Sequence, residues 1–192
     1  MRQFIIALII TVSPLTAFAG QIQTQRLIGT IIPEFGVHSK SPLAIAWKRE
    51  LAIAKVEFDK LFAGDIKQKP KGITAFYNAT FKLSDKTIIL SIMGTIGCTE
   101  YSGASVAPSI QTCPAKIITL QHNKIIYIQN IARIAFAFPA TSDDIAIDSA
   151  SKTDYTLVSF NPSAHQITTK VYAAGKLSNW GNNTHHPITL SE

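Results

Sequence analysis

Six apolar, β-branched segments follow one another between residues 73 and 174, and no helical pattern separates any of them from the next. They are ITAFYNATFKL, TIILSIMGTI, KIITLQ, KIIYIQN, YTLVSF and HQITTKVYAA. In the first segment apolar and polar residues alternate, which is the period of a half-buried strand. Parallel strands would need long crossover connections, usually helices. The sequence therefore predicts an α+β fold with a curved antiparallel meander of about six strands.

Polar turn residues separate these segments in pairs. Ser84-Asp85-Lys86 follows the first strand, His122-Asn123 divides KIITLQ from KIIYIQN, and residues 161–164 (NPSA) divide the last two strands. Such residues favour the tight connections of hairpins. The segment IARIAFAFP is expected to extend a strand as far as Pro139.

An amphipathic helix is predicted before the strands, in SPLAIAWKRELAIAKVEFDKLFAG. Ser41 is a candidate N-cap, Pro42 stands at the first helical position and Gly64 lies just past the end. Apolar residues recur at spacings of three and four, at Leu43, Trp47, Leu51, Ala54, Phe58 and Leu61. We expect this N-terminal helix to pack across the sheet; a helix that instead binds a partner is the alternative interpretation.

The first residues resemble a secretory signal peptide. Arg2 supplies the positive end, an apolar run extends from Phe4 to Val12, and Ala17-Phe18-Ala19 has the small residues of a cleavage site. The alternative is a buried N-terminal helix. We predict cleavage after Ala19, so that the protein is periplasmic or secreted. Residues 20–192 are then expected to form one domain, with an extended arm at 20–40 and a polar tail at 178–192.

Cys98 and Cys113 are the only cysteines of the chain, and an even pair in an oxidising compartment predicts a disulfide. The fourteen residues between them form a connection longer than the two to six that is usual. Long ordered loops often carry function. We predict that Tyr101, Val106 and Ile110 contact a protein partner from this loop. The alternative is a bridge that only prevents strand fraying.

The chain has 18 basic and 12 acidic residues, a net charge of +6. Such a balance favours anionic partners such as envelope polymers, phospholipid headgroups or an acidic protein. The densest cluster is Lys67, Lys69 and Lys71, a candidate anion-binding patch. A solvated linker is favoured over that patch because Gly64, Pro70 and Gly72 already predict a break. The cluster lacks the interleaved aromatic residues of a single-strand nucleic-acid groove, so no nucleic-acid partner is expected.

No motif predicts catalysis or a cofactor. Ser149-Ala150-Ser151-Lys152 matches an S-x-x-K pattern, but its companion motifs are absent from the sequence. His185-His186 and the acidic run TSDDIAIDS have neither the spacing nor the partners of a metal site, and both are interpreted as exposed. Trp180 is interpreted as a lid on the edge of the core. We expect neither an enzyme, a cofactor nor a metal, and no later segment is apolar and long enough to span a membrane.

The order of helix, hairpin, cysteine-bracketed loop and hairpin in a small exported basic chain is similar to that of bacterial periplasmic lysozyme inhibitors. LSDKTIILSIMGTIGC resembles the strand that leads into their inhibitory loop, and the resemblance covers about a third of the chain. That family's loop carries a histidine, whereas residues 99–112 contain none. No functional residue is therefore carried over from the family.

Three functional classes fit these features to different degrees. A small non-enzymatic, inhibitor-like binding protein that uses the loop 98–113 fits best. A structural accessory subunit of a cell-envelope or secretion assembly is the alternative. An enzyme fits least, because the sequence lacks a recognisable catalytic motif.

Overall fold

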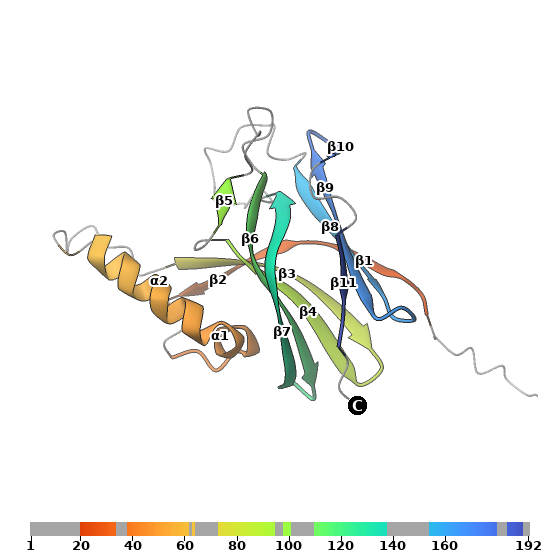
Figure 1. Cartoon of the computed structure of the whole chain (residues 1–192). Coiled ribbons are helices and arrows are strands. Elements are labelled where there is room, and N and C mark those ends of the chain that lie inside the picture. Colours follow the sequence, from red (N-terminus) through yellow and green to blue (C-terminus); the bar gives the residue numbers. More distant parts are fainter. Residues whose placement is uncertain are drawn as a thin grey trace, which may run out of the picture.

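A computed structural model gives the fold of the chain and describes residues 20–33, 38–61, 63, 73–94, 98–100, 110–137, 154–179 and 184–189. The described strands form a six-stranded sheet, called sheet B, and a five-stranded sheet, called sheet A. Sheet B occupies the middle of the molecule; sheet A lies on one side of it and the helices on the other (Figure 1). The predicted signal peptide, residues 1–19, lies outside the described residues.

Sheet B is antiparallel and contains most of the predicted meander. Its strands are β2 (Ile28–Pro33), β3 (Ile73–Leu83), β4 (Lys86–Met93), β5 (Thr99–Glu100), β6 (Ile110–Gln121) and β7 (Lys124–Ala137). The order is β2-β3-β4-β6, with β7 on the other side of β6, and β5 pairs with β6 beyond the end of β4. His122 and Asn123 form the β6–β7 turn with φ of 50° and 62°, the left-handed conformation that tight hairpin turns require.

Sheet A is also antiparallel and contains the last predicted hairpin. Its strands are β1 (Gln23–Arg26), β8 (Tyr155–Asn161), β9 (Gln166–Ala173), β10 (Lys176–Leu177) and β11 (Thr184–Pro187). The order is β1-β8-β9-β10, and β11 also pairs with β9.

The prediction of a single meander is wrong, because the strands divide between two sheets. The chain passes from sheet A to sheet B at Leu27, which is buried and donates its backbone N–H to Thr156 O at 3.1 Å. It returns to sheet A between β7 and β8. Within the predicted arm, residues 20–40, the structure places β1 and β2, and within the predicted polar tail, residues 178–192, it places β11.

The main core lies between the two sheets. Sheet B contributes alternate residues of its strands, among them Phe81, Leu90 and Phe136, and sheet A contributes Phe160 and Ile167. Phe81 and Phe160 meet across the layers with ring centroids 5.6 Å apart. The period-two pattern of the sequence therefore selects the face of each strand that is buried.

The helical segment is interrupted and does not lie at the N-terminus, since β1 and β2 precede it. It forms α1 (Pro42–Ala46) and α2 (Lys48–Leu61), with Trp47 between them at φ −103°. The predicted N-cap is confirmed, because Ser41 Oγ accepts a hydrogen bond from Ala44 N at 3.2 Å. Packing across the sheet is confirmed as well.

The helices cover the face of sheet B that points away from sheet A. A second cluster joins the two layers: it includes Trp47, Leu51 and Ala54 from the helical segment and Phe76 and Ile118 from the strands. Both faces of sheet B are therefore buried over the region where the helices lie.

Glutamine side chains join the two sheets at both seams. Gln25 Oε1 accepts from the Thr80 N–H, and Gln23 Oε1 accepts from the Lys82 N–H, where β3 extends beyond β2. At the other seam Gln129 of β7 donates to Pro187 O at 2.9 Å and accepts from Thr189 N at 3.3 Å. These carboxamides satisfy backbone groups that no neighbouring strand pairs there.

Candidate functional site

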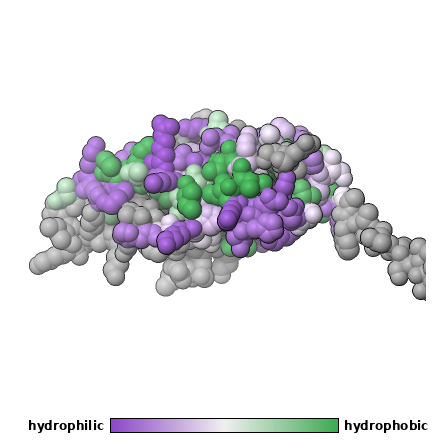
Figure 2. All heavy atoms as spheres, turned by 90° about the horizontal axis from the view of Figure 1, so that it is seen from below, coloured by the Kyte–Doolittle hydropathy of each residue, from purple (hydrophilic) through white to green (hydrophobic). Residues whose placement is uncertain are grey.

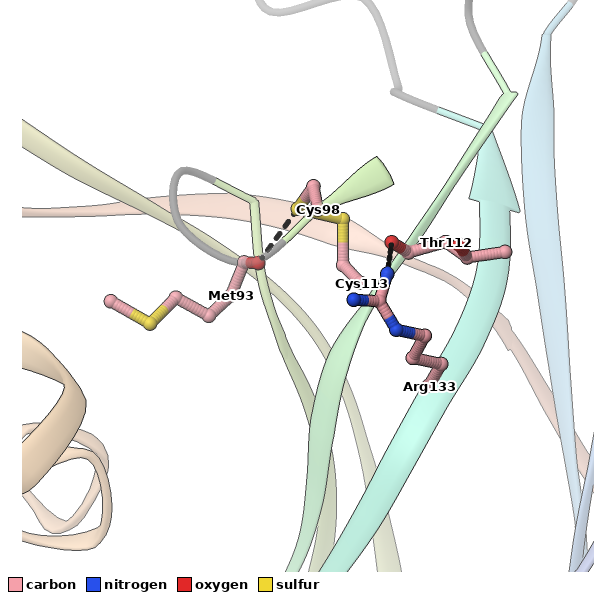
Figure 3. Close-up of a disulfide and its surroundings, with 5 residues drawn as sticks. All are labelled: Met93, Cys98, Thr112, Cys113 and Arg133. Carbon is pink, nitrogen blue, oxygen red and sulfur yellow. Dashed lines mark hydrogen bonds between the residues drawn. A yellow bond between two sulfur atoms is a disulfide. The ribbon is translucent and has the colours of Figure 1, made fainter. Parts of the chain in front are cut away.

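The predicted disulfide between Cys98 and Cys113 is present, with sulfur atoms 2.01 Å apart and a Cα–Cα distance of 4.2 Å. Cys113 belongs to β6 and is fully buried in the main core, whereas Cys98 is half-buried just before β5. Cys98 Sγ also lies 3.3 Å from Met93 O, the end of β4 (Figure 3). A disulfide sulfur has no proton to donate, so this is a close contact. The bridge ties the start of the loop to a strand of the core.

Backbone pairing holds the root of the loop on both sides. Thr99 and Glu100 pair with Thr112 and Gln111, so that the chain leaves and re-enters sheet B on adjacent strands. On its other side β6 pairs with β7 along nearly its whole length. The root lies at the end of sheet B opposite the β6–β7 turn (Figure 1). Both ends of the loop are therefore fixed before residue 101 and from residue 110 onward.

The prediction that Ile110 is an exposed partner contact is wrong. Ile110 is 3% exposed and packs in a small cluster with Ala135, Ala137 and Val171. Strands β6, β7 and β9 all contribute to this cluster, so it joins the two sheets beside the loop root. Ile110 therefore anchors the returning end of the loop.

Arg133 is a charged residue at the loop root that the sequence analysis did not single out. Its side chain is exposed on β7, and Nη1 lies 3.5 Å from Thr112 O, next to Cys113 (Figure 3). The sequence feature that could have identified Arg133 is its position as the lone cation in the otherwise apolar segment IARIAFAFP. Arg133 places a permanent positive charge at the base of the loop.

Several predicted site residues lie outside the described residues. These are Tyr101 and Val106 of the loop, the cluster Lys67, Lys69 and Lys71, the S-x-x-K segment 149–152, the acidic run 141–149, and Trp180. Of the predicted disulfide and partner-binding residues the structure describes Cys98, Cys113 and Ile110, and it joins the two cysteines to each other.

The two adjacent histidines belong to β11 and are not both exposed, contrary to the expectation for this segment. His186 is 9% exposed, and its Nε2 has no hydrogen-bond partner among the described residues, whereas His185 is exposed with Nδ1 3.2 Å from Thr168 Oγ1. Successive side chains of a strand point to opposite faces, so the two rings do not converge on one ion. Burial lowers the pKa of His186 below its ordinary value, and the neighbouring His185 lowers it further.

Within the part of the chain that the structure describes, no three side chains of His, Cys, Asp or Glu are grouped as metal ligands would be. None of the described helices is both long and apolar enough to cross a bilayer.

No family model, no curated protein and no solved structure matches the chain. The similarity to lysozyme inhibitors is thus one of element order, and no family assignment follows from it.

Proposed function

We propose that the protein is an exported, non-enzymatic binding protein that contacts a protein partner through the loop between Cys98 and Cys113. The observation that supports this most is the fixed loop root: a disulfide to the buried Cys113, the β5–β6 pairing and the burial of Ile110 hold both ends of the loop in place. A fixed root reduces the conformational freedom that a loop loses on binding.

Tyr101 and Val106 are the proposed contacts of the loop. Tyrosine presents a large amphipathic surface of the kind enriched at interface anchors, and valine adds apolar area. Arg133 extends this surface at the loop root, because its exposed guanidinium lies beside Thr112. The proposal favours a partner that offers an apolar pocket with a carboxylate near its rim.

The test is partner capture with a loop variant that keeps the root intact. Residues 101–109 are replaced by a Gly/Ser linker, so that Cys98, Cys113 and Ile110 remain. The native protein and the variant are then used as bait in cell-envelope extract, and bound proteins are identified by mass spectrometry. We expect the native protein to recover one specific protein that the linker variant does not recover. Tyr101→Ala is expected to weaken capture without a change in the circular dichroism spectrum.

A matched control alters another exposed turn, Ser163→Gly with Ala164→Gly in the β8–β9 connection. This control is expected to capture the partner as the native protein does. Equal capture by the native protein and the folded linker variant would show that the loop is only a connection. Recovery of a multi-protein complex independent of the loop would favour the accessory subunit of an envelope or secretion assembly.

A further inference from the structure

The helical segment exposes aliphatic side chains on the side that faces away from the sheet. Ile45, Ile53 and Val56 are 54%, 46% and 54% exposed. The inward side of the same segment supplies Trp47 and Leu51 to the cluster beneath it. The exposed residues therefore add little to the packing of the helices. Ile53 and Val56 are three residues apart and thus neighbours on the surface of α2.

Cations occupy the same side of α2. At 3.6 residues per turn, Arg49 and Lys60 project on the same side as Ile53 and Val56, opposite Leu51. Both cations are exposed, and neither forms an ion pair among the described residues. Seen from below, the part of the molecule where α1 and α2 lie carries hydrophobic residues among hydrophilic ones (Figure 2).

The acidic residues of α2 do not neutralise these cations. Glu50 points toward the sheet and pairs with Lys116 at 2.9 Å, and Asp59 pairs with Lys55 at 2.5 Å. Glu57 is exposed and, at 100° per residue, projects about 40° from Ile53 and about 60° from Lys60, at one edge of the outward side. The outward side therefore carries aliphatic residues, two cations and one carboxylate at its edge, which leaves it with a net positive charge.

We propose that the outer helix face, formed by Arg49, Ile53, Val56 and Lys60 of α2, docks on the surface of an anionic phospholipid bilayer. Aliphatic residues of such a face enter the boundary between headgroups and acyl chains, and the long cationic side chains reach the headgroup phosphates. The charge of the face complements an anionic lipid surface.

Other occupants fit this face less well. In a symmetric contact between two copies, the same patch meets itself, which would bring the Arg49 and Lys60 side chains of both copies together. Contacts with protein partners are usually centred on aromatic anchors, and the outer helix face has none. An anionic bilayer accepts both the aliphatic and the cationic side chains of the face over a broad area.

The face is held in place by contacts on its inner side. Lys116 Nζ donates to Ala46 O at 2.8 Å, at the junction of α1 and α2, and Trp47 Nε1 donates to Ser91 Oγ at 2.9 Å. The helices are thus already folded before they meet the membrane, so binding would not have to pay the ordering cost of coupled folding. This surface shares no residue with the proposed loop contact, so the two proposals are tested separately.

The test measures flotation of the purified protein with vesicles, after expression with its own N-terminal segment so that any processing takes place. The vesicles contain phosphatidylcholine alone or phosphatidylcholine with phosphatidylglycerol. We expect binding to the anionic vesicles that decreases as salt is raised. Arg49→Gln and Lys60→Gln are each expected to weaken it about fivefold at low salt. Ile53→Ser with Val56→Ser is expected to weaken it by about tenfold or more.

Two control variants change exposed residues of the same kinds elsewhere. Ile28→Ser alters a 66% exposed isoleucine on β2, and Lys170→Gln alters an exposed lysine on β9. Both are expected to bind as the native protein does. The proposal is overturned if the native protein does not bind anionic vesicles, or if the controls lose as much binding as the helix variants. Self-association in sedimentation velocity that the helix variants abolish would instead assign the face to a second copy.

Discussion

The ammonium group of Lys116 lies 2.9 Å from each carboxylate oxygen of Glu50, although the two residues are 66 positions apart. The side chains are 9% and 31% exposed, so the cation is much the more buried partner. The same ammonium group lies 4.5 Å from the ring centroid of Trp47 and donates to Ala46 O. One cation of the central sheet thus holds the junction of the two helices.

Removal of the carboxylate is expected to cost more stability than removal of the cation. Glu50→Ala leaves the buried ammonium of Lys116 without a counter-charge, and we expect the free energy of unfolding to fall by about 1–3 kcal/mol. Lys116→Met keeps much of the side-chain volume and leaves a carboxylate that water can reach, so a smaller loss is expected. Urea denaturation followed by circular dichroism measures both.

The exposed ion pair on α2 provides the control for this comparison. Lys55 and Asp59 are 47% and 38% exposed, and Lys55→Gln is expected to change stability by less than about 0.5 kcal/mol. Equal losses for Glu50→Ala and Lys116→Met, or a larger loss for Lys116→Met, would contradict the unequal burial of the pair.

Reduction of the disulfide is expected to destabilise the fold without unfolding it. Cys98 and Cys113 close a loop with a sequence separation of 15, for which the chain-entropy model gives about 3 kcal/mol. We expect a lower urea midpoint in the presence of a reductant. The variant with both cysteines replaced by alanine should show no further effect of the reductant. An unchanged midpoint of the native protein under fully reducing conditions would argue against this contribution.

The hairpins could be predicted because their signals are local. Tyr77, Ala79 and Phe81 alternate with polar residues along β3, and all three are buried in the main core. The polar residues His122 and Asn123 mark the β6–β7 turn in the sequence itself. A period of two and a turn signal together determine a strand pair without information from distant residues.

The division into two sheets could not be predicted in the same way. Gln23 and Gln25 look like the polar residues of a free arm, but their carboxamides bond to the backbone of β3, more than 50 positions away. The helix break at Trp47 likewise lies beside Lys116, whose ammonium group donates to the carbonyl of Ala46 from 70 positions away. These features result from long-range contacts that the local pattern does not contain.

The candidate site shows the same limit. Two cysteines, together with the predicted signal peptide, were sufficient to predict the disulfide. Whether Ile110 is exposed was decided by Ala137 and Val171, which other strands bring beside it. An apolar residue at the end of a strand is buried or exposed according to neighbours that are distant in the sequence.

His186 is expected to make stability depend on pH. Burial lowers its pKa below the ordinary value of 6.5, so the unfolded chain binds a proton at a higher pH than the folded protein does. The contribution of His186 is therefore fully present above pH 6.5 and decreases as the pH falls below that value. Thermal unfolding between neutral and mildly acidic pH measures this slope. His186→Leu is expected to flatten it, whereas His185→Gln retains most of it; an equal slope in all three proteins would contradict the prediction.

The seam between β7 and β11 is expected to open when Gln129 is changed. Its carboxamide donates to Pro187 O at the end of β11 and accepts from the Thr189 N–H just beyond that strand. Gln129→Ala removes both hydrogen bonds, and we expect a loss of about 1–2 kcal/mol and faster hydrogen exchange at the Thr189 amide. Gln129→Glu keeps the acceptor for Thr189 and is expected to retain part of that protection.

The neighbouring exposed residue supplies the control, Asn130→Ala, which is expected to leave the exchange rate of the Thr189 amide unchanged. A Thr189 amide that exchanges equally in the native protein and Gln129→Ala would show that β9 alone holds β11 in place.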